Sequence, residues 1–95
     1  MRYFKINSEG VHQREWGGFP TDWLEVDEVG NIEREINEYP NGNTLTYDKT
    51  HQQDEYGALT TDNIEPDDKF WKLLEITKYE FERKWNTISP INRIN

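Results

Sequence analysis

Carboxylates are the side chains in this sequence that are most able to perform chemistry, and most of them lie in residues 21–68. This segment has 14 Asp and Glu residues against only Arg34 and Lys49, a net charge of −12, whereas residues 1–20 carry +1 and residues 69–95 carry +3. Paired carboxylates can perform acid–base catalysis when burial shifts the pKa of one of them. No pair is singled out for that role, because the acidic residues are expected to face water. We therefore expect a protein that is not an enzyme.

Metal and nucleophile sites are not indicated by the sequence either. His12 and His51 stand in separate expected loops, with no second ligand at a metal-binding spacing. Residues 62–68 offer oxygen ligands of the kind that Ca²⁺ prefers, but they lack the spacing of an EF-hand loop and are also typical of a helix amino terminus. Both interpretations stay open. The chain has no cysteine and no phosphate-binding or nucleophile-elbow motif, so we expect no cofactor.

The overall charge limits the class of partner. The sequence has 11 basic and 19 acidic residues, a formal net charge of −8. Nucleic-acid binding needs stripes of basic residues, so we expect no nucleic-acid partner. Concentrated negative charge opposes folding through self-repulsion, but it can steer a basic protein to its binding site. Solubility alone also explains a charged surface, and this alternative stays open.

Aromatic residues indicate a folded domain despite a mean hydropathy of −1.10. The 95 residues include 4 Trp, 5 Tyr and 4 Phe, whereas disordered chains are poor in aromatic residues. The length suits a single domain, which we expect over residues 1–88, followed by a flexible tail over 89–95. No apolar run approaches the roughly 18 residues of a membrane span, and no secretory signal is recognisable. We expect a cytoplasmic protein with no membrane partner.

Alternation of apolar and polar residues predicts an antiparallel β-meander. The expected strands are residues 2–7, 23–28, 32–39 and 44–47, with 56–60 as a less regular fourth or fifth strand. Ser8-Glu9-Gly10 is the expected first turn, and Asn41-Gly42 is the strongest hairpin signal because both residues tolerate a positive φ. The fold class is therefore α+β, with an antiparallel meander of four to five strands packed on one face by two C-terminal helices.

The two helices are predicted from caps and spacing. Pro66-Asp67-Asp68 is a helix start, after which Phe70, Leu73 and Leu74 would face the core. Thr77 begins a capping box for the second helix. Its expected apolar stripe is Phe81, Trp85 and Ile88.

The register of the first hairpin decides which side chains share a face. A three-residue loop at 29–31 places Leu24 opposite Ile36 and gathers the apolar residues on one buried face. A two-residue turn would set Glu25 opposite Ile36 and mix acidic residues with the core. We therefore predict the three-residue loop, and a two-residue turn at Asn41-Gly42 then extends the same buried face.

Arg34 falls on the buried face in this register. A buried guanidinium needs a carboxylate partner, and Glu28 and Glu38 are the expected partners. The alternative, in which Arg34 grips a carboxylate or phosphate of a ligand, stays open.

The opposite face of the predicted sheet is acidic and edged with aromatic residues, which makes it the candidate partner-binding surface. Carboxylates would supply charge, and aromatic side chains would supply anchors that lose contact with water on binding. The predicted partner-binding residues are Trp23, Glu25, Asp27, Glu33, Glu35, Tyr39, Asp54, Glu55 and Tyr56.

Residues 23–86 also contain turn and core positions in a recognisable order. These are Glu25, Asp27, Gly30 and Arg34, then Tyr39 and Gly42, then Tyr56, Gly57 and Leu59, and finally Glu75-Ile76-Thr77, Glu80-Phe81 and Trp85. The order resembles a bacterial family of small, acidic single-domain proteins of unassigned function. The resemblance implies a sheet-plus-helix fold and an association with toxin–immunity gene pairs, and it carries no catalytic residue. The first 22 residues and the segment from Thr87 onward depart from it.

These observations lead to one functional expectation and one alternative. We expect an immunity protein that binds and neutralises a basic bacterial toxin through the acidic sheet face, with a cognate toxin domain as partner and a nuclease as the favoured class. The alternative is a small ligand-binding or structural domain with no inhibitory role. A ligand-binding domain would use Arg34, Glu38 and Tyr47 around a pocket.

Overall fold

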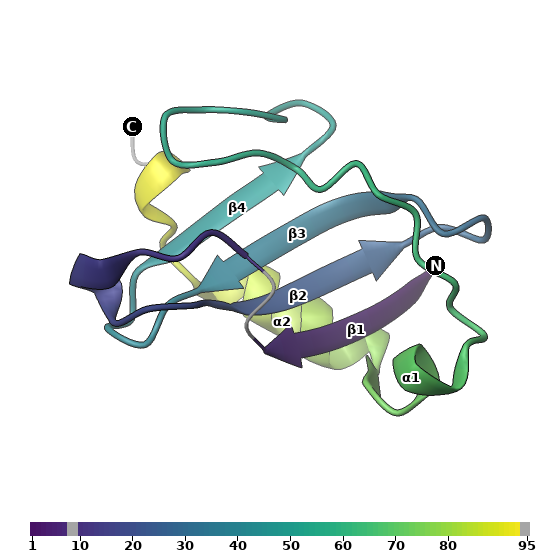
Figure 1. Cartoon of the computed structure of the whole chain (residues 1–95). Coiled ribbons are helices and arrows are strands. Elements are labelled where there is room, and N and C mark those ends of the chain that lie inside the picture. Colours follow the sequence, from purple (N-terminus) through teal and green to yellow (C-terminus); the bar gives the residue numbers. More distant parts are fainter. Residues whose placement is uncertain (8–9, 94–95) are drawn as a thin grey trace.

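Five strands form one antiparallel sheet in the computed structural model, which describes residues 1–7 and 10–93 (Figure 1). They are β1 (Arg2–Asn7), β2 (Thr21–Val26), β3 (Ile32–Glu38), β4 (Thr44–Asp48) and β5 (Glu75–Ile76). The strand order is β4-β3-β2-β1-β5, so the first four strands form an up-and-down meander and β5 pairs with β1 at the far edge. The structure confirms the α+β meander. Ser8 and Glu9 of the predicted first turn lie outside the described residues.

Helix α2 covers one face of this sheet (Figure 1). The helical segments are η1 (Arg14–Trp16), α1 (Lys69–Lys72), α2 (Lys78–Thr87) and η2 (Ile91–Arg93). Thr77 caps α2 as predicted, since its Oγ1 accepts a hydrogen bond of 3.1 Å from the backbone N–H of Glu80. Phe81 is fully buried, and Trp85 and Ile88 pack around the same cluster. The predicted apolar stripe is therefore confirmed.

Two predicted elements differ from the structure. Residues 56–60 form no regular strand, and only an isolated bridge between Gln53 and Ala58 pairs this segment within the described chain. Helix α1 is a single turn that leaves Phe70 55% and Leu73 79% exposed rather than in the core. The helix stops early because the residues after it pair with the free edge of β1. Lys5 N–H donates a hydrogen bond of 3.1 Å to Leu74 O, and β5 continues this pairing.

The C-terminal segment packs against β4. Residues 91–93, predicted above as part of a flexible tail, form η2, and Asn92 Nδ2 donates a hydrogen bond of 2.8 Å to Thr46 O. Arg93 forms an ion pair with Asp48. Ile94 and Asn95 lie outside the described residues.

Both hairpins turn through three-residue loops that end on glycine. The loops are residues 28–30 and 40–42, and their last residues, Gly30 and Gly42, have φ of 90° and 94°. A left-handed third residue is typical of this loop type, and glycine adopts it without strain. The first predicted loop lies one residue too late in the chain and the second is one residue too short, so both predicted registers are wrong. Glycine is the last residue of each observed loop. The predicted first loop instead had Gly30 as its middle residue, and the predicted second loop consisted of Asn41 and Gly42 only.

A β-bulge completes the β2–β3 register. Val26 pairs with Ile32 and Glu25 pairs with Arg34, which leaves Glu33 as the extra residue. Beyond the bulge, Ile36 pairs with Trp23 and lies on the helix-covered face, not beside Leu24 as predicted.

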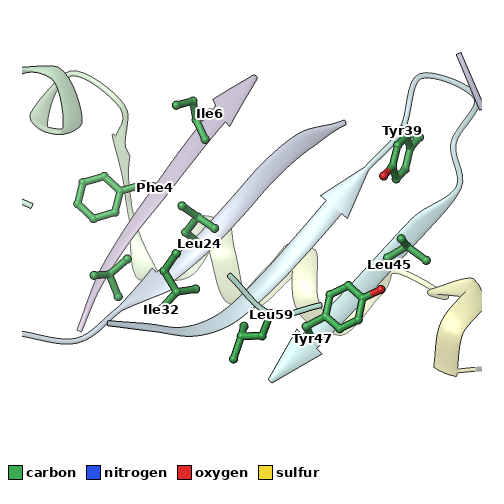
Figure 2. Close-up of a cluster of buried hydrophobic side chains, with 9 residues drawn as sticks. Phe4, Ile6, Leu24, Ile32, Tyr39, Leu45, Tyr47 and Leu59 are labelled. Atoms are coloured by element: carbon green, nitrogen blue, oxygen red, sulfur yellow. The ribbon is translucent and has the colours of Figure 1, made fainter. Parts of the chain in front are cut away.

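The sheet consequently has an apolar cluster on each face. On the face away from α2 the buried cluster comprises Phe4, Ile6, Leu24, Val26, Ile32, Tyr39, Leu45, Tyr47 and Leu59 (Figure 2). On the α2 face it comprises Tyr3, Trp23, Ile36 and Phe81. Among the described residues no long helix lies on the face away from α2, and side chains from loops and short helices, among them Trp16, Tyr56, Ile64 and Trp71, pack against its cluster.

Arg34 links α2 to the sheet. Its Nε and Nη2 donate hydrogen bonds of 2.8 and 2.7 Å to the carboxylate of Glu25, and Nη2 also donates to Glu82 of α2. The guanidinium lies 4.9 Å from the ring centroids of both Phe81 and Trp85. Hydrogen bonding from Arg34 holds the pKa of Glu25 below its ordinary value, although burial opposes this shift.

The expectation that Arg34 sits in a satisfied ion pair is confirmed, but its partners are Glu25 and Glu82. Glu38 instead pairs with Lys84, and Glu28 is exposed in the β2–β3 loop. The different register changes which carboxylates lie near Arg34, but the buried guanidinium is still paired with carboxylates.

Replacing Arg34 with Met is expected to lower the free energy of unfolding by about 2–4 kcal/mol, because it leaves the buried Glu25 carboxylate without its cation. Urea unfolding near neutral pH measures the effect. Arg83→Met, on the exposed side of α2, is the matched control and should change stability by less than about 0.5 kcal/mol. Equal losses in the two variants would show that the Arg34 ion pair does not hold α2 in place.

Candidate functional site

The nine predicted partner-binding residues do not share a face. Trp23 and Glu25 lie buried on the α2 side, whereas Glu35 and Tyr39 lie buried on the opposite side. The remaining five lie at the β2–β3 turn and in the 49–60 segment: Asp27, Glu33, Asp54, Glu55 and Tyr56. The prediction of one exposed acidic sheet face is therefore wrong. Beyond the bulge the register differs from the predicted one by one residue, and Glu25 and Glu35 lie on opposite sides of the sheet.

The buried residues of the predicted set make contacts within the protein. Trp23 has the ammonium groups of Lys5 and Lys84 over its ring, at 4.5 and 5.2 Å from the centroid. Tyr39 OH donates to Val11 O at 2.7 Å, and burial, followed by the nearby acidic charges, raises the pKa of Tyr39 to about 12. These side chains hold the molecule together and present no surface to a partner. The alternative pocket is also not formed, since Arg34 and Tyr47 lie on opposite faces of the sheet.

Glu35 belongs to a buried polar network on the face away from α2. Its carboxylate accepts a hydrogen bond of 2.8 Å from the backbone N–H of Thr60 and one of 3.0 Å from Asn37 Nδ2. The same Asn37 nitrogen donates to Asp22 at 2.7 Å. An amide thus separates two carboxylates that are each less than 5% exposed, which limits their mutual repulsion.

Asp54 organises the 49–60 segment. Its Oδ1 accepts hydrogen bonds from Tyr47 OH at 2.8 Å and from Tyr56 N–H at 2.9 Å, and its Oδ2 contacts His51 Nε2 at 2.7 Å and Asn92 Nδ2 at 2.9 Å. Burial alone would raise the pKa of Asp54, but the hydrogen bonds outweigh it and hold the pKa well below the ordinary value. Asp54 is therefore a structural anchor for this segment.

A cleft with a volume of about 620 Å³ lies on the face away from α2. We call it the acidic cleft. Ile6, Leu24 and Ile32 of the sheet form its apolar floor, and residues 60–65 form one wall. Phe70 and Trp71 of α1 form the other wall, with the Trp71 ring 5.7 Å from the ring of Phe4 in an edge-on contact.

Gly30 fixes the wall formed by residues 60–65. Ile64 N–H donates to Gly30 O at 3.0 Å, and Asn63 Nδ2 donates to Val29 O and to the side chain of Asn31. A Cβ on Gly30 would lie only 2.0 Å from Ile64 O. The loop between β2 and β3, which sets the register of these strands, therefore also holds the wall of the cleft in place.

Carboxylates give the cleft its electrostatic character. Asp62, Glu65 and Asp68 are exposed at its rim, and Asp22 lies at its floor. Among the described residues that line the cleft there is no Lys, Arg or His. Ion pairs with Lys and Arg hold Glu25, Glu38, Asp48 and Asp67, but in residues 1–7 and 10–93 no ion pair involves the three rim carboxylates. Three exposed carboxylates therefore stand around this cleft without an ion-pair partner in the described part of the chain.

Sequence reasoning identified the rim but not the cleft. Residues 62–68 were singled out as acidic, and Asp68 does cap α1 by accepting a hydrogen bond from Phe70 N–H at 2.9 Å. Trp71 was not singled out, and Phe70 was assigned to the core. The adjacent aromatic pair Phe70-Trp71, separated from the acidic run by Lys69 alone, was the available signal. The sequence pattern does not predict that this segment packs against Gly30.

Asp54→Asn is expected to lower the free energy of unfolding by about 2 kcal/mol near pH 6, because charged hydrogen bonds are lost. The lowered pKa means that Asp54 stabilises the fold fully above the unfolded-state value of about 3.9 and loses that effect as the pH falls through the folded-state value. The gap between the wild type and the variant should therefore narrow toward pH 2, measured by urea unfolding across this range. Glu55→Gln, next to it and exposed, should leave the pH profile unchanged; a gap that widens with acid would contradict the assignment.

Gly30→Ala and Gly42→Ala form a matched pair, because both positions have a φ near 90° but nothing lies within 4 Å of a Cβ at Gly42. Gly42→Ala should lower the free energy of unfolding by about 1–2 kcal/mol through backbone strain alone. Gly30→Ala should cost at least about 2 kcal/mol more, because Ile64 must also move, and amide hydrogen exchange at Ile64 should accelerate. Similar losses and unchanged exchange in both variants would contradict the seating of residues 60–65 on Gly30.

No helix among the described residues is long and apolar enough to cross a membrane. In the same part of the chain, no group of three or more His, Asp or Glu side chains is arranged to hold a metal ion. Comparison of the chain with protein-family models gives no match, and comparisons with curated proteins and with solved structures give none either. The family resemblance described above therefore stays a prediction.

Proposed function

We propose that this chain is a binding protein that inhibits a basic protein partner, as an immunity protein neutralises a toxin, and that the acidic cleft is its contact site. The observation that carries the proposal is the make-up of the cleft, whose described lining residues include four carboxylates and two partly exposed aromatic rings and no basic side chain. Aromatic side chains supply anchors at protein interfaces, and surrounding charge supplies specificity and a fast encounter. The cleft replaces the sheet face predicted from the sequence.

The charge of the whole chain supports a partner that is basic. Its formal net charge of −8 attracts cationic proteins at long range and repels nucleic acid. A nuclease is the favoured class of toxin, because the groove that binds its substrate is basic. In this proposal the protein acts in the cytoplasm, by occupation of the partner and without catalysis.

The test is protection of cells against the product of the neighbouring reading frame, the first candidate for a cognate toxin. Co-expression of this chain should restore colony formation, and Asp62→Lys/Glu65→Lys should abolish the protection. Glu15→Lys/Glu28→Lys changes the net charge equally at exposed positions outside the cleft and should retain it. Failure to protect would overturn the inhibitor proposal, and equal protection by both double variants would overturn the cleft as its contact site.

The association rate with the purified product provides a second measurement. Stopped-flow mixing should show the rate constant falling at least about tenfold as ionic strength rises from about 0.01 to 0.5 M, because salt screens the steering charges. A rate constant that is independent of salt would contradict the electrostatic argument.

A further inference from the structure

We infer that the acidic cleft accepts an arginine side chain of the partner protein. This inference rests on the proposed function and specifies the chemistry of the contact. Its basis is the way the cleft combines an apolar floor, an aromatic wall and carboxylates at two depths.

The floor and the walls fit a guest with an apolar stem. Ile6, Leu24 and Ile32 present aliphatic surface at the base of the cleft, and Ile64 adds more from the wall. Arginine and lysine side chains bury their methylene groups against such surface and keep the charged end near polar groups. The volume of about 620 Å³ lies within the range of about 300–1,000 Å³ that ligand clefts occupy, so it admits a side chain with its adjoining backbone.

The carboxylates fit a guest with a delocalised positive charge and several donors. Asp22 at the floor is only 4% exposed and already accepts a hydrogen bond from Asn37, and Asp62 and Glu65 stand at the rim in solvent. A guanidinium has five N–H donors in a planar fork and can contact carboxylates on more than one side. The lysine ammonium is a compact point charge that is more strongly hydrated.

The aromatic wall favours arginine over lysine for the same reason. Phe70 is 55% exposed, and its ring meets that of Trp71 edge-on at 5.4 Å. A guanidinium can stack on an exposed aromatic face and still donate hydrogen bonds in its plane. The structure already contains this arrangement elsewhere, where Arg34 lies against Phe81 and Trp85 and donates to Glu25 and Glu82.

The experiment is an NMR titration of the full chain with N-acetyl-arginine-N′-methylamide, with the citrulline and lysine counterparts as matched probes. Citrulline keeps the shape of arginine and removes its charge. We expect the arginine probe to shift the Trp71 indole N–H and the amides of residues 60–65, with a Kd on the order of 1 mM. The citrulline probe should bind at least about tenfold more weakly, and the lysine probe should fall between them.

Two pairs of variants localise the site. Asp62→Asn/Glu65→Gln should weaken binding of the arginine probe about tenfold, whereas Glu15→Gln/Glu80→Gln, which removes the same charge outside the cleft, should not. Phe70→Ala should weaken binding about threefold, and Phe19→Ala, at a ring that is similarly exposed (51%), should not. Each altered side chain is exposed, and the amide spectrum of each variant verifies its fold.

The inference is overturned if the citrulline probe binds as tightly as the arginine probe, if the two charge variants weaken binding equally, or if the shifts map outside the cleft. Its failure is distinguishable from failure of the proposed function. Protection that persists and depends on Asp62 and Glu65, without binding of the arginine probe, overturns the arginine inference alone. Binding of the probe in the cleft without any protection overturns the inhibitor proposal alone.

Discussion

Gly30 places two constraints on this fold at once, and the distribution of charge follows from both. Its left-handed backbone closes the loop between β2 and β3 at one position, which sets the pairing of Val26 with Ile32 and, after the bulge at Glu33, of Glu25 with Arg34. Its missing side chain admits Ile64 O to a position that a Cβ would occupy. One residue therefore decides which carboxylates the sheet buries and where the wall of the cleft stands.

Burial and pairing then divide the carboxylates into structural and exposed groups. Glu25 neutralises Arg34 under α2, Glu35 is held by Thr60 and Asn37, and Asp54 gathers hydrogen bonds from three segments. Each of these groups stabilises a particular contact, so their charge is not available to a partner. Among the exposed carboxylates around the acidic cleft, Asp68 caps α1, whereas the carboxylates of Asp62 and Glu65 make no ion pair or side-chain hydrogen bond with the residues that the structure describes. These rim carboxylates remain available to a partner, because no basic residue is among the described residues that line the cleft.

Much of this fold is predictable from the sequence, because the signals are local. The strand at Arg2–Asn7, the cap at Thr77 and the stripe of Phe81, Trp85 and Ile88 all follow from periodicity and capping chemistry within a few residues. The need of Arg34 for a carboxylate is equally local, since it follows from burying a guanidinium. Its partner Glu82 is not predictable in the same way, because it lies 48 residues away on a different element.

Register and long-range contacts account for what the sequence does not reveal. Apolar patterning favoured a register with all of its aliphatic residues on one face, but this sheet has an apolar cluster on each side, so Ile36 packs under α2 while Leu24 packs opposite. The pairing of Glu75–Ile76 with β1 depends on a free strand edge rather than on strand propensity. One wall of the cleft depends on the hydrogen bond from Ile64 to Gly30, which lies more than 30 positions earlier in the chain.

The register of β2 against β3 is the claim on which the rest of this account depends, and cross-strand nuclear Overhauser effects measure it directly. The structure predicts contacts between the backbone protons of Trp23 and Ile36 and between those of Glu25 and Arg34. Contacts that instead join Leu24 to Ile36 and Val26 to Arg34 would return the acidic residues to one exposed face. That result would contradict both the buried role of Glu25 and the assignment of partner binding to the acidic cleft.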